Sequence, residues 1–114
     1  MTPCIIESPY KGDVARNRRY LQRCIRWCVS KGFTPYASHQ MLTDALDDLD
    51  PEERELGIMA GLEMADLILD SHSDAVVYFF VDYGSSDGMS NYAWPHHHRR
   101  DRRIFEVMIG ENQE

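Results

Sequence analysis

The 114-residue sequence contains no long apolar run, no internal repeat and no low-complexity segment. No apolar stretch approaches the roughly 20 residues that are needed to span a bilayer. The first residues lack a basic segment followed by an apolar one, so no secretory signal is visible, and we expect a cytoplasmic location. With 43% hydrophobic and 27% charged residues, the composition is typical of a globular domain. A chain of this length buries one core, which predicts a single domain over residues 1–114.

Cysteine is scarce, with Cys4, Cys24 and Cys28 as the only three. Cys24 and Cys28 are four residues apart and lie on one face of a predicted helix, so we expect the cysteines to be small buried hydrophobic residues. A zinc site would need a second pair of ligands. The run His96-His97-His98 could supply one, but its spacing matches no common zinc-binding pattern. The sequence therefore predicts no metal and no other cofactor.

Positive charge is also scarce overall, because the net charge is −7. This balance argues against a general nucleic-acid-binding protein. Seven of the twelve basic residues fall between Lys11 and Lys31, and the eleven acids between Asp44 and Asp74 are interrupted by one base, Arg54. The basic residues near the first helix could hold a small anionic ligand, or they could form an ordinary solvated helix face.

Apolar periodicity and turn residues predict an alternation of strands and helices. Strands are expected at residues 4–8, 33–39, 75–81 and 103–109. Helices are expected at residues 14–30, 51–69 and 89–94, with Asp13 and Asp50 as N-caps and Pro95 ending the last helix. Residues 40–50 are expected to be irregular and to act as a flap or a subunit contact. Gly57 and Gly61 weaken the second helix, which indicates close packing against a neighbouring element.

This alternation predicts an α/β fold with a four- to five-stranded parallel sheet and right-handed crossovers. Ligands of such sheets bind at the carboxyl ends of the strands, where residues 7–12, 38–39 and 82–89 are expected to meet. Ser8, Gly12 and the following helix suit an anionic group such as phosphate. Ser85, Ser86 and Gly88 form a second loop of small residues whose N–H groups could bind phosphate or ribose oxygens.

Several motifs together resemble one family. They are Ile-Glu-Ser-Pro-Tyr-x-Gly-Asp-Val-x-Arg-Asn at residues 6–17, Pro-Tyr-Ala-Ser-His at 35–39, Asp-Pro-Glu-Glu-Arg-x-Leu-Gly-Ile-x-Ala-Gly-Leu at 50–62 and Gly-x-Ser-x-Gly-Met at 84–89. This set is similar to the small, often phage-encoded relatives of nucleoside 2-deoxyribosyltransferases. The resemblance implies a flavodoxin-like three-layer sandwich, a homo-oligomer and, for a phage protein, a location in the host cytoplasm.

The resemblance also implies an activity, namely cleavage of the N-glycosidic bond of 2′-deoxynucleosides or their 5′-monophosphates. In that superfamily a Glu carboxylate attacks C1′ of the sugar and an Asp assists as acid or base. The position of the nucleophile corresponds here to Tyr92, and the Asp falls near Asp66. Glu7 and Asp87 are the nearby acids that could replace the missing carboxylate.

Ser86 matches a phosphate-contacting serine of the superfamily, and Ser8 is similar to a second one. We therefore predict one set of catalytic candidates and one set of ligand contacts. The catalytic candidates are Asp66, Tyr92 and Glu7. The ligand contacts are Ser8, Pro9, Tyr10, Gly12, Asn17, His39, Asp82, Ser85, Ser86, Asp87, Gly88 and Met89.

Three functions remain open on the sequence. The first is a nucleotide-binding domain with N-glycosidase or deoxyribosyltransferase activity, the second is a sensor or sponge that binds a nucleotide without turnover, and the third is a phage protein that inhibits a host factor by protein contact. No membrane or nucleic-acid partner is expected. Residues 96–103 are predicted to be an exposed basic connector.

Overall fold

Four parallel strands form one sheet in the order β2-β1-β3-β4. The computed structural model describes residues 1–47 and 49–110, without the side chains of residues 39–41 and 44. The strands are β1 (Thr2–Glu7), β2 (Phe33–Tyr36), β3 (Val76–Phe80) and β4 (Ile104–Val107). The helices are α1 (Val14–Ser30), α2 (Ser38–Ala45), α3 (Pro51–Asp70), the π-helical turn η1 (Met89–Ala93) and α4 (Trp94–Arg99).

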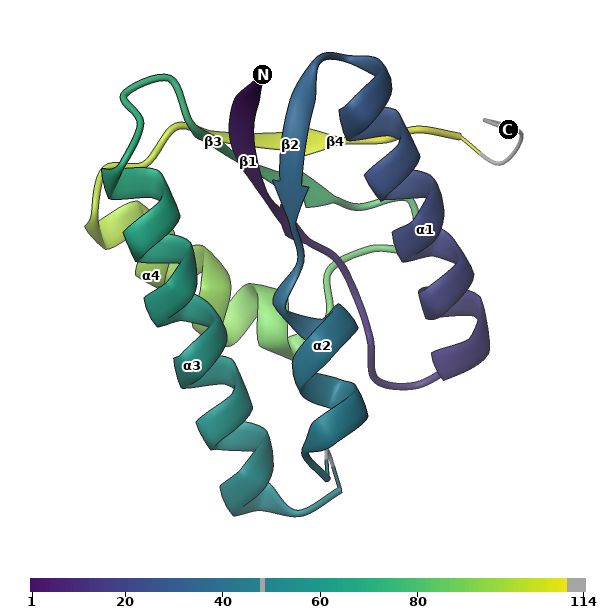
Figure 1. The fold of residues 1–114 in the computed structure, drawn as a ribbon. Coiled ribbons are helices and arrows are strands. Elements are labelled where there is room, and N and C mark those ends of the chain that lie inside the picture. The colour runs from purple at the N-terminus through teal and green to yellow at the C-terminus, as the bar shows by residue number, and fades with distance from the viewer. Residues whose placement is uncertain (48, 111–114) are drawn as a thin grey trace.

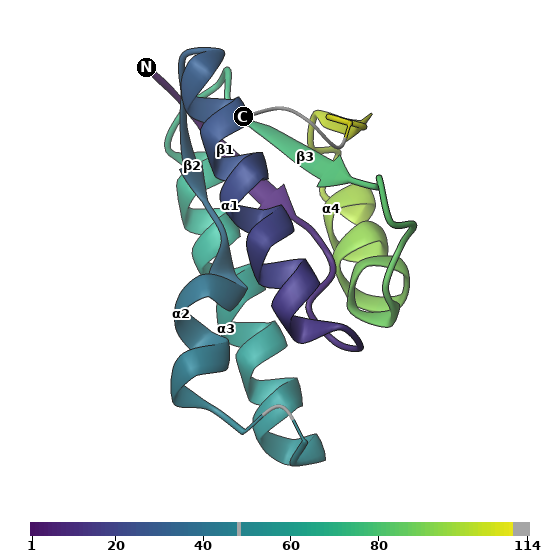
Figure 2. The ribbon, with the colours of Figure 1, turned by 90° about the vertical axis from the view of Figure 1, so that its right-hand side faces the viewer.

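The sheet is the middle layer of three, with α1 on one face and α3, η1 and α4 on the other (Figures 1 and 2). This arrangement confirms the predicted α/β sandwich with a parallel sheet. The chain leaves β1 toward β2 on one side and later places β3 on the other side. The carboxyl ends of β1 and β3 therefore flank the point at which the strand order reverses, where ligands of doubly wound sheets bind.

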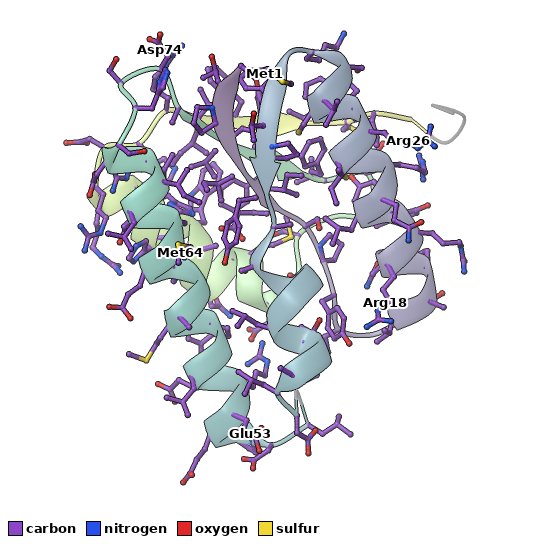
Figure 3. All side chains as sticks on the ribbon, viewed as in Figure 1. Met1, Arg18, Arg26, Glu53, Met64 and Asp74 are labelled. Carbon is purple, nitrogen blue, oxygen red and sulfur yellow. The ribbon has the colours of Figure 1, made fainter. Side chains whose placement is uncertain are left out.

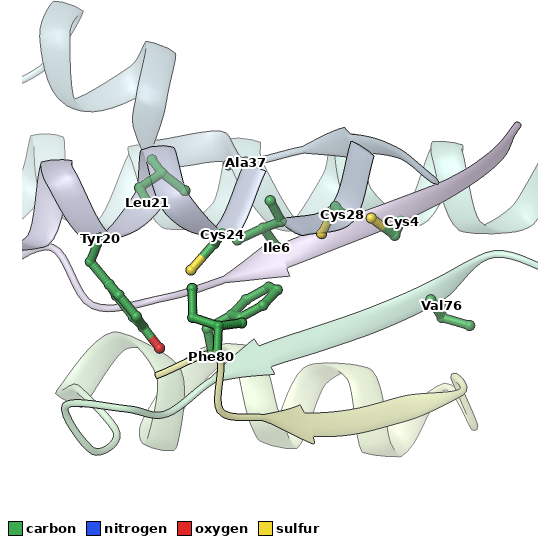
Figure 4. Packing of buried hydrophobic residues seen from close by; sticks show 10 residues of the cluster. Cys4, Ile6, Tyr20, Leu21, Cys24, Cys28, Ala37, Val76 and Phe80 are labelled. Atoms are coloured by element: carbon green, nitrogen blue, oxygen red, sulfur yellow. The ribbon is translucent and has the colours of Figure 1, made fainter. Parts of the chain in front are cut away.

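Side chains of β1 alternate between two hydrophobic cores. Cys4 and Ile6 pack under α1 with Cys24 and Cys28, as Figure 4 shows, whereas Ile5 packs under α3. All three cysteines are free thiols with no exposed surface. This burial confirms their predicted role as small hydrophobic core residues.

Two predictions about the helices are wrong. Part of the segment predicted to be irregular, residues 40–50, belongs to α2, which packs against α3. The packing is close because a Cβ atom added at Gly61 would lie 2.7 Å from the Cβ of Ser38. The glycines of α3 therefore make room for α2, a helix that its polar sequence does not predict. The predicted close packing of these glycines is confirmed.

Pro95 does not end the last helix. It stands in the first turn of α4, where the N–H that proline lacks has no role in the helical hydrogen-bond ladder. The helix continues to Arg99 and brings the three consecutive histidines into the folded structure. No helix among the described residues is long and apolar enough to cross a membrane.

Candidate functional site

A cavity of about 360 Å³ opens at the carboxyl ends of β1 and β3, a size typical of small-molecule sites. It is lined by residues from four segments: 7–12, 38–46, 53–62 and 86–93. Each of the three loops that the sequence marks as ligand-binding contributes to this lining. The structure adds the first half of α3, which the sequence does not mark.

The β1–α1 loop supplies Ser8, Tyr10, Lys11 and Gly12 to the cavity wall. Gly12 has a φ of +100°, a conformation that favours glycine, so the loop turns sharply before α1. Asn17 does not line the cavity. Its buried side-chain amide donates to the carbonyl oxygens of Tyr10 (3.0 Å) and Lys11 (3.2 Å), and so holds the loop in place.

The second loop supplies Ser86, Asp87, Gly88 and Met89. The Ser86 hydroxyl accepts a hydrogen bond from the backbone N–H of Met89 at 3.3 Å, as an N-cap does. The Asp87 carboxylate accepts hydrogen bonds from Asn91 and Arg54. Both bonds lower the pKa of Asp87, and the one from Asn91 has the larger effect. The loop is therefore fixed by its own contacts at the mouth of the cavity.

Arg54 is a cavity residue that the sequence analysis does not select. It lies in the first turn of α3, with only 20% of its side chain exposed, and its guanidinium forms a 3.1 Å ion pair with Asp87. Its guanidinium carbon also lies 5.9 Å from the ring centre of Tyr92. The one available signal is its isolation, as the single base in a stretch of eleven acids. With Lys11, it gives the cavity two cationic side chains.

Glu7 is the carboxylate at the end of β1, and it lines the cavity with 15% of its side chain exposed. Its Oε2 lies 3.0 Å from Nε2 of His97, which is fully buried on α4. Burial raises the pKa of Tyr36, at the end of β2, and the negative charge of Glu7 raises it further. Of the three predicted catalytic candidates, Glu7 is the one that lines the cavity.

The surroundings of His97 determine which nitrogen carries its hydrogen. Nδ1 is buried and has no hydrogen-bond partner among the described residues. An N–H at that position would be an unpaired buried donor, which costs free energy. We therefore assign the hydrogen to Nε2, from which the imidazole donates to the Glu7 carboxylate. The contact orients Glu7 and leaves its other oxygen for a ligand.

The two other catalytic candidates do not line the cavity. Asp66 lies near the end of α3, half-buried, where its carboxylate contacts His96 (2.9 Å), Arg100 (3.2 Å) and Arg102 (3.2 Å). Tyr92 is 38% exposed on η1, outside the cavity lining. Asp66 is consequently part of an ion-pair cluster that ties α3 to α4 and the chain after it.

Residues 96–103 are only in part the exposed connector that the sequence predicts, because residues 98–101 and 103 are exposed but the other three are not. His97 is fully buried against Glu7, and His96 is only 19% exposed against Asp66. Arg102 is 13% exposed and also bonds Asp70 at 2.6 Å. The prediction fails at these three residues because a helix sends consecutive side chains toward different neighbours, so a polar run need not be solvated along its whole length.

Asp82 also lies outside the cavity lining. Its carboxylate accepts hydrogen bonds from the Tyr20 hydroxyl (2.5 Å) and from the backbone N–H groups of Ile109 (3.0 Å) and Gly110 (2.8 Å). It therefore fastens the end of the chain after β4 to α1. Among the other predicted contacts, Pro9 and Ser85 do not line the cavity, and the side chain of His39 lies outside the described residues. The described residues contain no group of three or more His, Cys, Asp or Glu side chains that could hold a metal ion.

A protein-family model, described as a domain of unknown function (DUF7768), matches residues 2–104. The chain belongs to the DUF7768 family. The matched region contains the whole lining of the cavity, from Glu7 to Ala93, so the DUF7768 domain includes the candidate site. No curated protein and no solved structure matches the chain. The resemblance to nucleoside 2-deoxyribosyltransferases stays a prediction.

Proposed function

We propose that the cavity binds a nucleoside monophosphate or a related ribosyl phosphate. The observation that carries this proposal is the composition of its walls. The two loops after β1 and β3 contribute the hydroxyl groups of Ser8 and Ser86, and Lys11 and Arg54 add positive charge. Hydroxyl groups, backbone N–H groups and cations are the usual partners of a phosphate.

The remaining wall suits the base of a nucleotide. The helices α2 and α3 contribute Leu42, Ile58 and Leu62, and the residue that follows α2 contributes Leu46. A site with an apolar wall and a few convergent polar groups is typical of small-molecule binding. The two kinds of wall together favour a ligand with one anionic and one flat apolar part.

We also propose that Glu7 is the catalytic carboxylate of this site. A Glu7 oxygen attacks C1′ of the sugar, and the bond between C1′ and the base nitrogen breaks. The electron pair of that bond leaves with the base, which takes a proton from water. A second water then hydrolyses the glycosyl ester and restores the carboxylate. The Nε2–H of His97 holds the carboxylate in one orientation.

The assay for this function measures release of free base from deoxynucleoside monophosphates by chromatography. We expect release by the wild-type protein and none by Glu7→Gln, which keeps an oxygen to accept the His97 hydrogen bond. As a matched control, Tyr92→Phe should release base at the wild-type rate, because Tyr92 lies outside the cavity. Release that survives Glu7→Gln would contradict the role of Glu7.

A second candidate function is binding of the same nucleotide without turnover. It is favoured by Tyr92, because the resemblance implies a nucleophilic Glu at this position and a tyrosine there favours loss of the usual chemistry. Thermal stabilisation of the protein by a nucleotide, without release of base, would support this sensor or sponge. If a nucleotide does not stabilise the protein and no base is released, both candidates are contradicted and a protein-contact function is favoured.

A further inference from the structure

The side of α3 that faces away from the sheet is apolar. Its large exposed residues are Leu56, Met59, Met64 and Leu67, which are 61%, 56%, 44% and 65% exposed. The opposite side of the same helix is also apolar and is buried in the core through Ala65 and Leu69. A helix that is apolar on both sides normally has a partner on each of them.

No element of the described chain covers this outer side. In Figure 1, α3 runs along one edge of the molecule, with α2 beside its first half and α4 behind it. In Figure 3, Met64 marks the middle of this helix. From Leu56 to Leu67 the exposed apolar side spans three helical turns, which corresponds to roughly 16 Å along the helix. An exposed apolar strip of this length, interrupted by Glu63, marks an interaction surface.

The spacing of the four residues shows which partner fits. Leu56 and Leu67 are equally far from the midpoint between Gly61 and Leu62, and Met59 and Met64 are also equally far from it. A helix with this spacing is its own complement when two copies pack antiparallel. Leu56 of each copy then meets Leu67 of the other, and Met59 meets Met64. Such a self-complementary patch is what a two-fold interface between identical chains requires.

We propose that the protein forms a homodimer in which two copies of α3 pack antiparallel through these four residues. The proposal does not rest on the nucleotide function. It does connect to the cavity, because Arg54, Gly57, Ile58 and Leu62 of the same helix line it. Each copy's cavity is then backed by a helix that the other copy holds in place.

One charged residue opposes this pairing. Glu63 is exposed on the same side of α3 and lies close to the two-fold axis, where it faces Ala60 of the second copy. The two Glu63 carboxylates repel each other across the axis, and added salt weakens that repulsion. The dimer should therefore tighten, rather than weaken, as the salt concentration rises. Glu63→Gln should tighten it in the same way at low salt.

The first experiment is sedimentation equilibrium at protein concentrations up to about 200 µM, well above the micromolar Kd of a weak interface. We expect a dimer for the wild type and a Kd that is weaker by about tenfold or more for Leu56→Glu/Leu67→Glu. Val29→Glu is the matched control, because Val29 is also exposed (50%) but lies on α1. Circular dichroism checks that each variant is folded.

The second experiment determines the orientation of the two helices by disulfide formation. The native cysteines are fully buried and should not react. A mixture of Leu56→Cys and Leu67→Cys proteins should cross-link under oxidation, and so should Ala60→Cys alone, whereas Leu56→Cys alone should not. A wild-type monomer at all concentrations, a dimer unaffected by Leu56→Glu/Leu67→Glu, or cross-linking of Leu56→Cys alone would overturn the proposal.

Discussion

At the scale of single residues, the cavity depends on side chains whose own contacts fix their positions. Glu7 is oriented by His97, Ser86 caps the following helix, and Arg54 is paired with Asp87. A group that is already held in place loses little conformational entropy when a ligand binds. The groups that are proposed to bind the anion, and the Glu7 carboxylate, are therefore preformed.

Substitution of Arg54 tests the proposed anion-binding side of the cavity at a single residue. Arg54→Gln should weaken nucleotide binding by at least about tenfold, since a hydrogen bond to a charged group contributes roughly 1.5–3 kcal/mol. Arg26→Gln, on an exposed part of α1 far from the cavity (Figure 3), is the control and should bind as the wild type does. Calorimetric titration measures both. Equal affinities for the two variants would exclude Arg54 from the phosphate site.

Part of the site could be predicted from single residues and part could not. Ser8, Gly12 and Ser86 follow strands that local apolar patterns reveal, so their common position was predictable. The contact of Glu7 with His97 joins residues 90 positions apart and depends on how α4 packs under β1. A polar run such as His96-His97-His98 gives no local sign of that burial.

At the scale of elements, the packing of α2 on α3 forms one wall of the cavity. The sequence predicted close packing at the glycines of α3. It did not predict α2, the helix that they accommodate, because residues 40–50 have no clear apolar periodicity. The stability of α2 comes from its contact with α3 rather than from its own propensity. The strands β1 and β3 and the helix α1 were predictable because their apolar patterns are local and strong.

Gly61→Ala tests this packing. The added methyl group would lie 2.7 Å from the Cβ and Oγ of Ser38, so α2 has to shift. We expect the free energy of unfolding to fall by up to about 2 kcal/mol, which is the usual cost of overpacking less the gain in helix propensity. Gly57→Ala is the matched control, because its methyl would meet only the flexible tip of Leu46 at 3.3 Å. Urea unfolding curves of equal midpoint for the two variants would contradict the close approach.

Asp82 joins the chain after β4 to α1, and this connection should depend on pH. Burial raises the pKa of Asp82, but the hydrogen bonds from Tyr20 and from two backbone N–H groups outweigh it, and the pKa is lowered overall. A group whose pKa is lower in the folded state stabilises the protein above its unfolded pKa of about 3.9 and loses that contribution as the pH falls through its folded pKa.

The measurement is the melting temperature of the wild type and of Asp82→Asn from neutral to acidic pH. The wild type should be the more stable at neutral pH, and the difference should shrink below about pH 4, where the carboxylate takes up a proton. Other acids affect both proteins alike, so the difference isolates Asp82. A difference that stays constant, or widens, in acid would show that the charge of Asp82 does not hold the chain end.

At the scale of the whole molecule, one small sheet gathers the polar ends of two strands, a buried histidine and the inner face of α3 around a single cavity. The family match covers this entire arrangement. The parallel sheet was predictable from the alternation of elements. The order of its strands, and hence the cavity between β1, α2 and α3, depends on contacts between distant segments that no local pattern encodes.

Both loops are proposed to bind the phosphate of one nucleotide. The most direct test is calorimetric titration of a deoxynucleoside monophosphate into the wild type, Ser8→Ala and Ser86→Asp. Aspartate keeps the N-cap at position 86 but places a negative charge in the cavity, so the fold should survive while the anion is repelled. We predict one bound nucleotide per chain in the wild type, weaker binding in Ser8→Ala and none in Ser86→Asp. Unchanged affinity in both variants, or no binding to the wild type, would contradict the phosphate site.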